Sequence, residues 1–342
     1  MALEAKHIPD AWLRTFHVVI FLGGLTGRVA CDSHDAATVH RENVGELVQL
    51  ARRMKAPQTL IFASTSAICE GSGDTPASER EWAPKAALLD SYSASMLERE
   101  AQMYLHSASS SGGGGAAPQL IGLRFGTVIG NSRGQRTDLG PMALVKSAFT
   151  TGVLSVSHPE TARAFLWLED LVSAFDLLLA KRQTAAVPPF GIFHLLSFNS
   201  HVGQLAAAVA ARTGARIEAR EHPVGHDVLG FSLNGSALHR AVGFRPRADL
   251  AVAVDDLVSH APDSLVAKGA HRKEEVHAGA ASHLHGHHNL SWHGNVQSKR
   301  YSLESIKCPV CGSTELQLVL DLHEQPLAND FCSREDEANH LQ

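Results

Sequence analysis

The chain has 342 residues and a formal net charge of −5, with 44% hydrophobic and 19% charged residues. This length predicts about two folded domains, and the composition is that of a globular protein, which excludes a chain disordered throughout. The slight excess of acidic residues gives no reason to expect nucleic acid or an anionic membrane as a partner.

Cysteine usage and the distribution of apolar residues indicate the compartment. The five cysteines include a Cys308-x-x-Cys311 pair and fit a reducing compartment better than a disulfide framework. The longest apolar run near the start, residues 18–25, is far shorter than the roughly 20 residues of a membrane span. No basic-then-apolar leader precedes that run. We therefore expect a cytoplasmic protein without a membrane partner.

The first half of the chain alternates strand and helix patterns. The predicted elements are a buried strand at residues 18–22, a helix at 35–54, a strand at 59–62, a helix capped by Asp90 or Ser91, and a strand at 118–125. This alternation predicts a parallel α/β sheet. Gly23 and Gly24 follow the first strand directly, which favours close approach of the backbone to a bound molecule, although any core strand can end in such a turn.

The second half predicts smaller elements and then loses its pattern. A strand-to-helix junction is expected at residues 165–171, a strand at 193–196, a helix at 202–213, and amphipathic segments at 235–242 and 250–260. Residues 107–117 are of low complexity and are expected to form a flexible insertion. The predicted domains are 1–150, a partial dinucleotide-binding domain; 151–262, a substrate-binding subdomain; 263–303, a disordered His-rich linker; and 304–342, a partial zinc-binding module.

Hydroxyl side chains stand at the end of one predicted strand, and a tyrosine begins the next helix. The strand at residues 59–62 leads to Ser66, and Tyr92 lies in the first turn of the following helix. This pattern resembles the short-chain dehydrogenase/reductases. In that family the Tyr transfers the proton during hydride chemistry and the Ser orients the substrate oxygen. A Lys four residues after the Tyr lowers the pKa of the phenol.

The resemblance extends over the first 260 residues and is specifically to the extended, NAD-dependent nucleotide-sugar epimerase/dehydratases. The matching segments occur in family order: residues 18–24, 43–44, 64–67, Tyr92, 123–130, 163–171 and 238–246. The resemblance implies a Rossmann-like fold and the following site residues: for catalysis Tyr92, Ser66 and Asn43; for NAD or NADP Gly23, Gly24, Tyr92 and Thr127; for a nucleotide-sugar substrate Arg163 and Ser66. A homodimer is left open as an assembly.

Two departures from the family pattern predict impaired activity. The Gly-rich turn that opens a dinucleotide fold and cradles the pyrophosphate is missing, so the Rossmann-like domain is expected to be partial and to bind NAD weakly. Met96 also occupies the position of the lysine. Lys85 and Arg99 are the nearest cations in the sequence, and because a guanidinium is not interchangeable with an ammonium, we do not expect Arg99 to compensate.

The C-terminal residues predict half of a zinc site. Cys308 and Cys311 form a tight knuckle, and the segment from residue 308 to 331 resembles the zinc-binding module of sugar C-methyltransferases. A structural zinc ion requires four ligands, and only Cys332, His323 and His340 are candidates for the other two positions. A solvated linker is a simpler explanation than a metal site for the His-rich run before them.

Three interpretations of function follow. The first is an NAD(P)-dependent enzyme of the epimerase/dehydratase type acting in sugar-nucleotide or deoxysugar metabolism. The second is a remnant that binds a sugar nucleotide or a partner without turnover. The third is a fragment of a fused epimerase and sugar C-methyltransferase gene.

Overall fold

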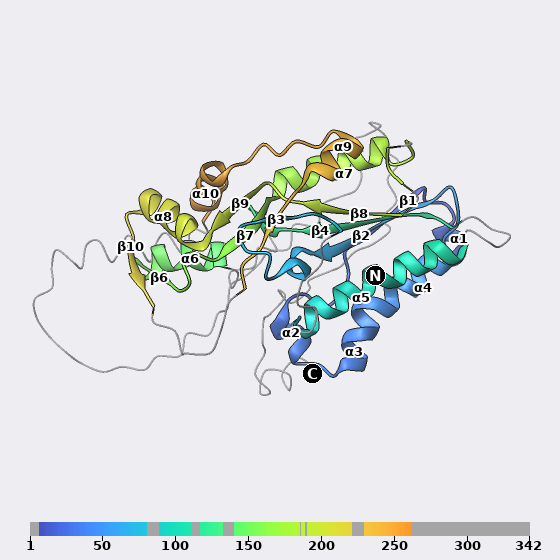
Figure 1. The fold of residues 1–342 in the computed structure, drawn as a ribbon, viewed down its shortest axis with the longest axis horizontal. Coiled ribbons are helices and arrows are strands. Elements are labelled where there is room, and N and C mark those ends of the chain that lie inside the picture. The colour runs from blue at the N-terminus through green and yellow to red at the C-terminus, as the bar shows by residue number, and fades with distance from the viewer. Residues whose placement is uncertain are drawn as a thin grey trace, which may run out of the picture.

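The computed structural model describes residues 7–80, 89–110, 117–132, 140–184, 186–188, 190–220 and 229–261. Its centre is a four-stranded parallel sheet in the order β1-β2-β4-β8 (Figure 1). The strands are β1 (Val18–Phe21), β2 (Thr59–Thr65), β4 (Gln119–Phe125) and β8 (Phe190–Leu195). The predicted parallel α/β sheet is therefore confirmed.

Helices cover both faces of this sheet. On one face lie α4 (Glu46–Arg53) and α5 (Ser91–Ser110), and on the other α7 (Leu168–Lys181) and α9 (Ser236–Val242) (Figure 1). Nearly every residue of β2 is buried, as expected for a strand covered on both sides. Helix α5 continues through Ser110, so it takes in the first residues of the segment predicted as a flexible insertion.

The helix predicted at residues 35–54 forms as three consecutive segments. Asp35 caps α3 (Ala36–His40) by accepting a hydrogen bond of 2.9 Å from the Thr38 amide. A π-helical turn, Arg41–Gly45, then leads into α4. Single π-turns often lie at functional sites, and this one contains Asn43.

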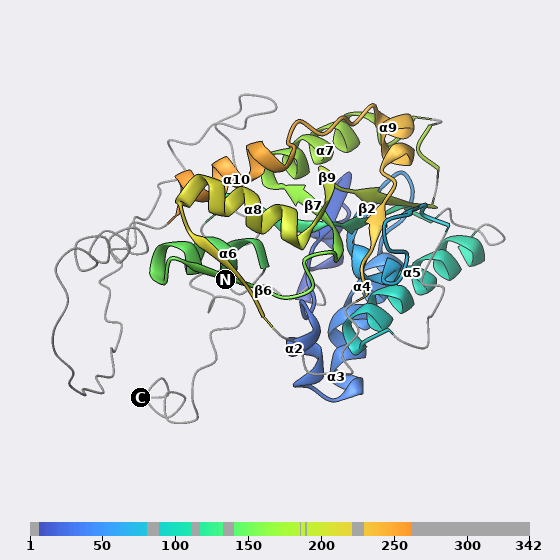
Figure 2. The same cartoon turned by 60° about the vertical axis from the view of Figure 1, so that its left-hand side comes forward.

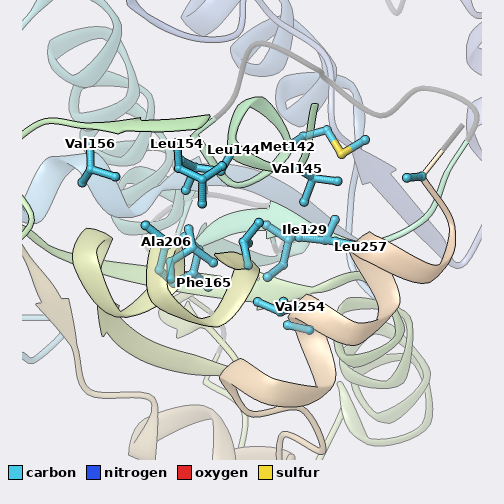
Figure 3. Packing of buried hydrophobic residues seen from close by; sticks show 14 residues of the cluster. Ile129, Met142, Leu144, Val145, Leu154, Val156, Phe165, Ala206, Val254 and Leu257 are labelled. Carbon is cyan, nitrogen blue, oxygen red and sulfur yellow. The ribbon is translucent and has the colours of Figure 1, made fainter. Parts of the chain in front are cut away.

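A second lobe lies beside the carboxyl edge of the sheet. It contains α6 (Gly140–Thr150), α8 (Val202–Thr213) and α10 (Leu250–Ser259), which gather together in Figure 2. Its strands are β5 (Thr127–Ile129), β7 (Ala162–Trp167) and β9 (Phe198–His201) in one sheet, and β6 (Val153–Val156) with β10 (Arg216–Ala219) in another. Figure 3 shows its core, in which Val145, Leu154 and Phe165 are buried together with Val254 and Leu257.

The two lobes are interleaved along the chain. The predicted boundary at residue 150 falls at the end of α6, but α6 packs in the second core. Later elements return to the first sheet, because Leu178 of α7 and Leu238 of α9 pack against Ile61 and Ile121. Residues 151–262 are therefore shared between two cores.

The remaining described elements are short. They are α1 (Asp10–Leu13), α2 (Arg28–Asp32), the 3-10 turn Ser66–Cys69, β3 (Pro76–Ala77) and β11 (Ser232–Leu233). In the described part of the chain no helix is both long enough and apolar enough to cross a membrane. The predicted linker and the predicted zinc ligands Cys308 and Cys311 lie outside the described residues. Within the ranges given above, no cluster of three or more His, Cys, Asp or Glu side chains could hold a metal.

Candidate functional site

A cavity of about 520 Å³ opens at the carboxyl ends of β1, β2 and β4. The parallel register aligns these ends, since Phe21 lies opposite Phe62 and Thr65 lies opposite Phe125. In open α/β sheets this edge is the usual place for a bound ligand. Its wall includes Gly23, Gly24, Arg28, Thr65, Ser66, Glu70, Tyr92, Met96, Arg99, Thr127 and Arg163.

Six of the seven residues predicted for catalysis, cofactor and substrate meet at this cavity. They are Gly23, Gly24, Ser66, Tyr92, Thr127 and Arg163. They come from five separate stretches of sequence that the fold brings together. Their roles remain predictions, but their common location is a property of the fold.

Asn43 is the exception, because it is fully buried behind the cavity wall. Its side-chain nitrogen donates to Ser95 Oγ at 2.9 Å, and its side-chain oxygen accepts from the Leu25 amide at 2.7 Å. These contacts tie the π-turn to α5 and to the turn after β1. The Asn43 side chain therefore supports the turn after β1, and its catalytic role stays a prediction.

Tyr92 occupies the first turn of α5. Asp90 caps this helix, since its Oδ1 accepts from the Ser93 amide at 2.7 Å. The Thr65 hydroxyl lies beside the phenol. Burial raises the pKa of Tyr92 above its usual value of 10, and hydrogen bonding to Thr65 and the nearby Arg99 charge oppose this rise only in part. The hydroxyl that meets the phenol is therefore that of Thr65, one residue before the predicted Ser66.

Sequence analysis missed Thr65, although the signal was present in the run of hydroxyl residues that includes it. Thr65 Oγ1 also accepts from the Ala67 amide at 3.2 Å, which caps the 3-10 turn that follows β2. Ser66 lines the same cavity and is only 4% exposed. Both hydroxyls are thus held by a rigid strand end.

The position of the family lysine is apolar, and a different cation lies on the cavity wall. Met96 is 5% exposed and lies one helical turn after Tyr92. Arg99 is 1% exposed and lies on the same wall. Its guanidinium donates to the carbonyls of Ala63 at 2.9 Å, Gly23 at 3.0 Å, and Asn43.

Gly24 makes the close approach of Arg99 feasible. Its φ is +130°, a conformation that residues with a Cβ rarely adopt. A Cβ at this position would lie 2.7 Å from both Arg99 Nη2 and Asn43 Oδ1. The second glycine of the predicted pair is therefore required by the packing behind the cavity.

A cluster of charges lies at another part of the wall. Arg28 forms ion pairs with Glu70 and with Asp90. Burial raises the pKa of Glu70, and the neighbouring Arg28 and Arg163 charges oppose that rise. This pairing connects the start of α2, the segment after β2 and the cap of α5.

A second cavity, also of about 520 Å³, shares Thr127 and Arg163 with the first. It lies in the second lobe, and its wall includes the hydroxyl side chains of Ser147, Ser155 and Ser157. Arg163 Nη1 donates to the carbonyls of Ala162 at 3.0 Å and Leu229 at 2.9 Å. Arg163 thus stands at the junction of two adjoining compartments.

A buried polar network supports the sheet edge beneath the site. Arg124 and Glu100 form a bidentate ion pair, with Nε to Oε1 at 2.9 Å and Nη2 to Oε2 at 2.7 Å. Ser64 Oγ donates to Glu100 Oε1 at 2.5 Å. These bonds fasten α5, which carries Tyr92, to β4 and β2.

His194 and Cys69 continue this network as neutral groups. Burial and the Arg124 charge lower the pKa of His194 to about 3, and burial raises the pKa of Cys69 to about 11. Arg124 Nη1 lies 3.3 Å from His194 Nε2. Because arginine can only donate, that ring nitrogen accepts. Neither group is an ionised nucleophile or base at neutral pH.

His194 should destabilise the fold in acid. Its folded-state pKa lies below the unfolded value of 6.5, so its stabilising contribution is present above pH 6.5 and is lost as the pH falls toward about 3. The loss can reach about 1.4 kcal/mol per pH unit. Urea unfolding measures the free energy of unfolding of the parent and of His194→Gln from neutral pH to about pH 4.5. This free energy should fall less steeply with decreasing pH in the variant. An equal pH dependence of the free energy of unfolding in the two proteins would contradict the neutral state of His194.

Comparison with known proteins agrees with this arrangement. The profile of the NAD dependent epimerase/dehydratase family matches residues 9–190, just over half of the chain. The chain belongs to this family. A search of curated proteins gave no significant match.

Solved structures similar to this epimerase/dehydratase family member share its fold. RMD from Pseudomonas aeruginosa, complexed with NADPH, superposes with a TM-score of 0.63 at 17% identity, over 78% of this chain and 86% of that one. MoeE5 in complex with UDP-glucose and NAD gives 0.63 at 20% identity, over 77% and 85%. UDP-glucuronic acid 4-epimerase from Bacillus cereus, in complex with UDP-glucuronic acid and NAD, gives 0.60 at 17% identity, over 73% and 77%.

Proposed function

We propose that this family member binds a nucleotide sugar across the two adjoining cavities and carries out NAD(P)-linked epimerisation or dehydration on its sugar. The observation that carries the proposal is that the Tyr92 phenol and the Thr65 hydroxyl lie together on the wall of the first cavity. A phenol paired with a hydroxyl can transfer a proton to or from a sugar oxygen. The similar structures solved with UDP-sugars and NAD support this substrate class.

Tyr92 would move the proton at its phenol oxygen, and Thr65 would orient the substrate oxygen. This proposal places Thr65 in the role predicted for Ser66, because Thr65 is the hydroxyl that acts on the pKa of the phenol. Ser66 remains a proposed substrate contact from the same wall. Asn43 is proposed to act through position alone, by holding the turn after β1 with its side chain.

Arg163 is the proposed contact for the diphosphate of the substrate. It stands between the two cavities, and only its Nη1 is engaged in the hydrogen bonds of the described residues. A guanidinium can bind phosphate oxygens through two parallel N–H bonds. The sugar would then lie toward Tyr92, and the nucleoside would lie in the second cavity.

The residues around Tyr92 fit the nicotinamide end of NAD or NADP. Gly23 and Gly24 present bare backbone on the cavity wall, and Leu22, Phe125 and Val128 supply apolar surface there. The cofactor, when bound, supplies the hydride acceptor. The sequence contains no Gly-x-Gly-x-x-Gly turn for the pyrophosphate, so we expect cofactor affinity weaker than micromolar.

Calorimetric titration of the full chain with UDP-, dTDP- and GDP-sugars tests the proposed substrate class. We expect binding to one member of the panel, weakened about tenfold or more by Arg163→Gln, since a lost charged hydrogen bond costs about 1.5–3 kcal/mol. Arg245→Gln is the matched control, because Arg245 lines a different hollow. Failure of every sugar nucleotide to bind would overturn the proposal.

Measurement of product formation distinguishes an active enzyme from a remnant that binds the sugar nucleotide without turnover. Sugar-nucleotide binding without product at any pH at which the chain stays folded would favour the non-catalytic interpretation. The zinc module at residues 304–342, the cytoplasmic location and the homodimer remain predictions.

A further inference from the structure

Arg99 is a buried cation without an anionic partner in the described part of the chain. Its side chain is 1% exposed, and its hydrogen bonds all go to backbone carbonyls, those of Gly23, Asn43 and Ala63. Phe21 adds a ring face 5.6 Å from the guanidinium carbon. Burying a charge without an opposite charge is costly, so the retained positive charge requires a compensating role.

The fold places that charge on the same cavity wall as Tyr92. Arg99 follows Tyr92 by seven residues on α5, which places the two on one stripe of the helix. Both line the cavity at the end of β2, with Met96 between them in sequence on the same wall. The carbonyl bonds to two strand ends and to the π-turn fix the guanidinium at this place.

We propose that Arg99 is a positioning residue that supplies, from a different turn of α5, the positive charge for Tyr92 that the apolar Met96 cannot. From the sequence we did not expect Arg99 to compensate for the missing lysine, because the sequence could not show that the guanidinium is buried on the cavity wall. The proton-transfer role of Tyr92 rests on the proposed function. The electrostatic coupling of the two side chains does not depend on it.

Other groups around Tyr92 also raise or lower the pKa of its phenol. Burial raises the pKa of Tyr92, the Thr65 hydroxyl and the Arg99 charge lower it, and Cys31 on α2 and the cap residue Asp90 raise it. The other charged residues on the cavity wall are Arg28, Glu70 and Arg163. Burial lowers the pKa of Arg99, and the charge on Tyr92 opposes this shift. Because a guanidinium is not deprotonated in proteins, Arg99 stays charged while the phenol titrates.

Direct titration of the phenol tests the proposal without substrate or cofactor. The chain has three tyrosines, so the Tyr104→Phe/Tyr301→Phe background leaves Tyr92 as the only phenol. Its ultraviolet phenolate signal is followed with pH, and circular dichroism verifies the fold at each point. Arg99→Gln should move the midpoint to higher pH, so that the phenolate fraction at a fixed pH near the parent midpoint falls about threefold or more.

Matched variants separate charge from structure. Arg163→Gln removes another cation from the same wall and should leave the midpoint unchanged. Arg99→Lys keeps a positive charge, so its Tyr92 midpoint should lie between those of the parent and of Arg99→Gln. Arg99→Gln/Met96→Lys should restore a lower midpoint. A folded Arg99→Gln protein with the parent midpoint would overturn the proposal and leave Arg99 a purely structural role.

A second measurement covers the case in which Arg99→Gln does not fold. Coupling between two titrating sites is reciprocal, so the Arg99 Nε nuclear magnetic resonance of the intact side chain should shift with the Tyr92 midpoint. The shift should vanish in Tyr92→Phe, which keeps Arg99 and its carbonyl partners. An Arg99 Nε resonance that does not shift when Tyr92 ionises would also overturn the proposal. Because every readout is made on the unliganded chain, absence of sugar-nucleotide binding would leave this result unaffected.

Discussion

Replacing Tyr92 with phenylalanine should lower kcat by about a hundredfold to ten-thousandfold, the range of general acid–base catalysis. The substitution removes one oxygen from a side chain in the first turn of α5 and keeps the ring. Affinity for the sugar nucleotide should therefore change little. The measurement is the steady-state rate on the sugar nucleotide that binds in the calorimetric panel, with NAD in excess.

The control and the pH profile sharpen this test. Tyr104→Phe lies on the same helix at a 58% exposed position and should keep the parent rate. Because the pKa of Tyr92 is raised, a rate that depends on the phenolate should climb with pH by up to about tenfold per unit below that pKa. The residual rate of Tyr92→Phe should lack this climb. Parent-like rates in Tyr92→Phe would remove Tyr92 from the mechanism.

Replacing Glu100 with leucine should lower the free energy of unfolding by about 3–5 kcal/mol. The side chains of Arg124 and Glu100 are 3% and 7% exposed, so the substitution leaves a buried guanidinium without its bidentate partner. It also removes the acceptor of the Ser64 hydroxyl. Guanidinium chloride unfolding at neutral pH measures the loss.

Two further variants show whether the loss comes from the broken pair. Glu98→Leu, on the same helix, removes a half-exposed carboxylate that pairs with His40 at the surface and should cost less than about 1 kcal/mol. Glu100→Leu/Arg124→Leu removes both buried charges and should recover much of the stability. If Glu100→Leu costs no more than Glu98→Leu, the pair does not stabilise this fold as described.

Local patterns in the sequence determined most of the main elements. The helix predicted at residues 202–213 forms with those bounds, because its apolar spacing continues to Thr213 and Gly214 ends it in a left-handed conformation. The apolar run before Ala63 forms the central strand, and Asp90 caps the Tyr92 helix as predicted. Periodicity and caps act over a few residues, so one sequence is enough to show them.

The location of the site also followed from the sequence, since parallel strands bring their carboxyl ends to one edge. Gly23, Ser66, Tyr92, Thr127 and Arg163 meet there. The sequence did not show which side chains contact each other within the site. Thr65 and Ser66 are adjacent hydroxyl residues, and only the orientation of the strand end relative to α5 decides which one meets the phenol.

The tertiary structure alone decided the burial and the partners of Arg99 and the organisation of the lobes. The carbonyl partners of Arg99 lie 56, 36 and 76 residues away in the chain, and no local pattern encodes such contacts. The return of α7 and α9 to the first sheet likewise depends on packing against strands far earlier in the sequence. Backbone conformation is favoured by neighbouring residues, but the burial of a charge and the partner of a hydroxyl depend on which distant surfaces the fold brings into contact.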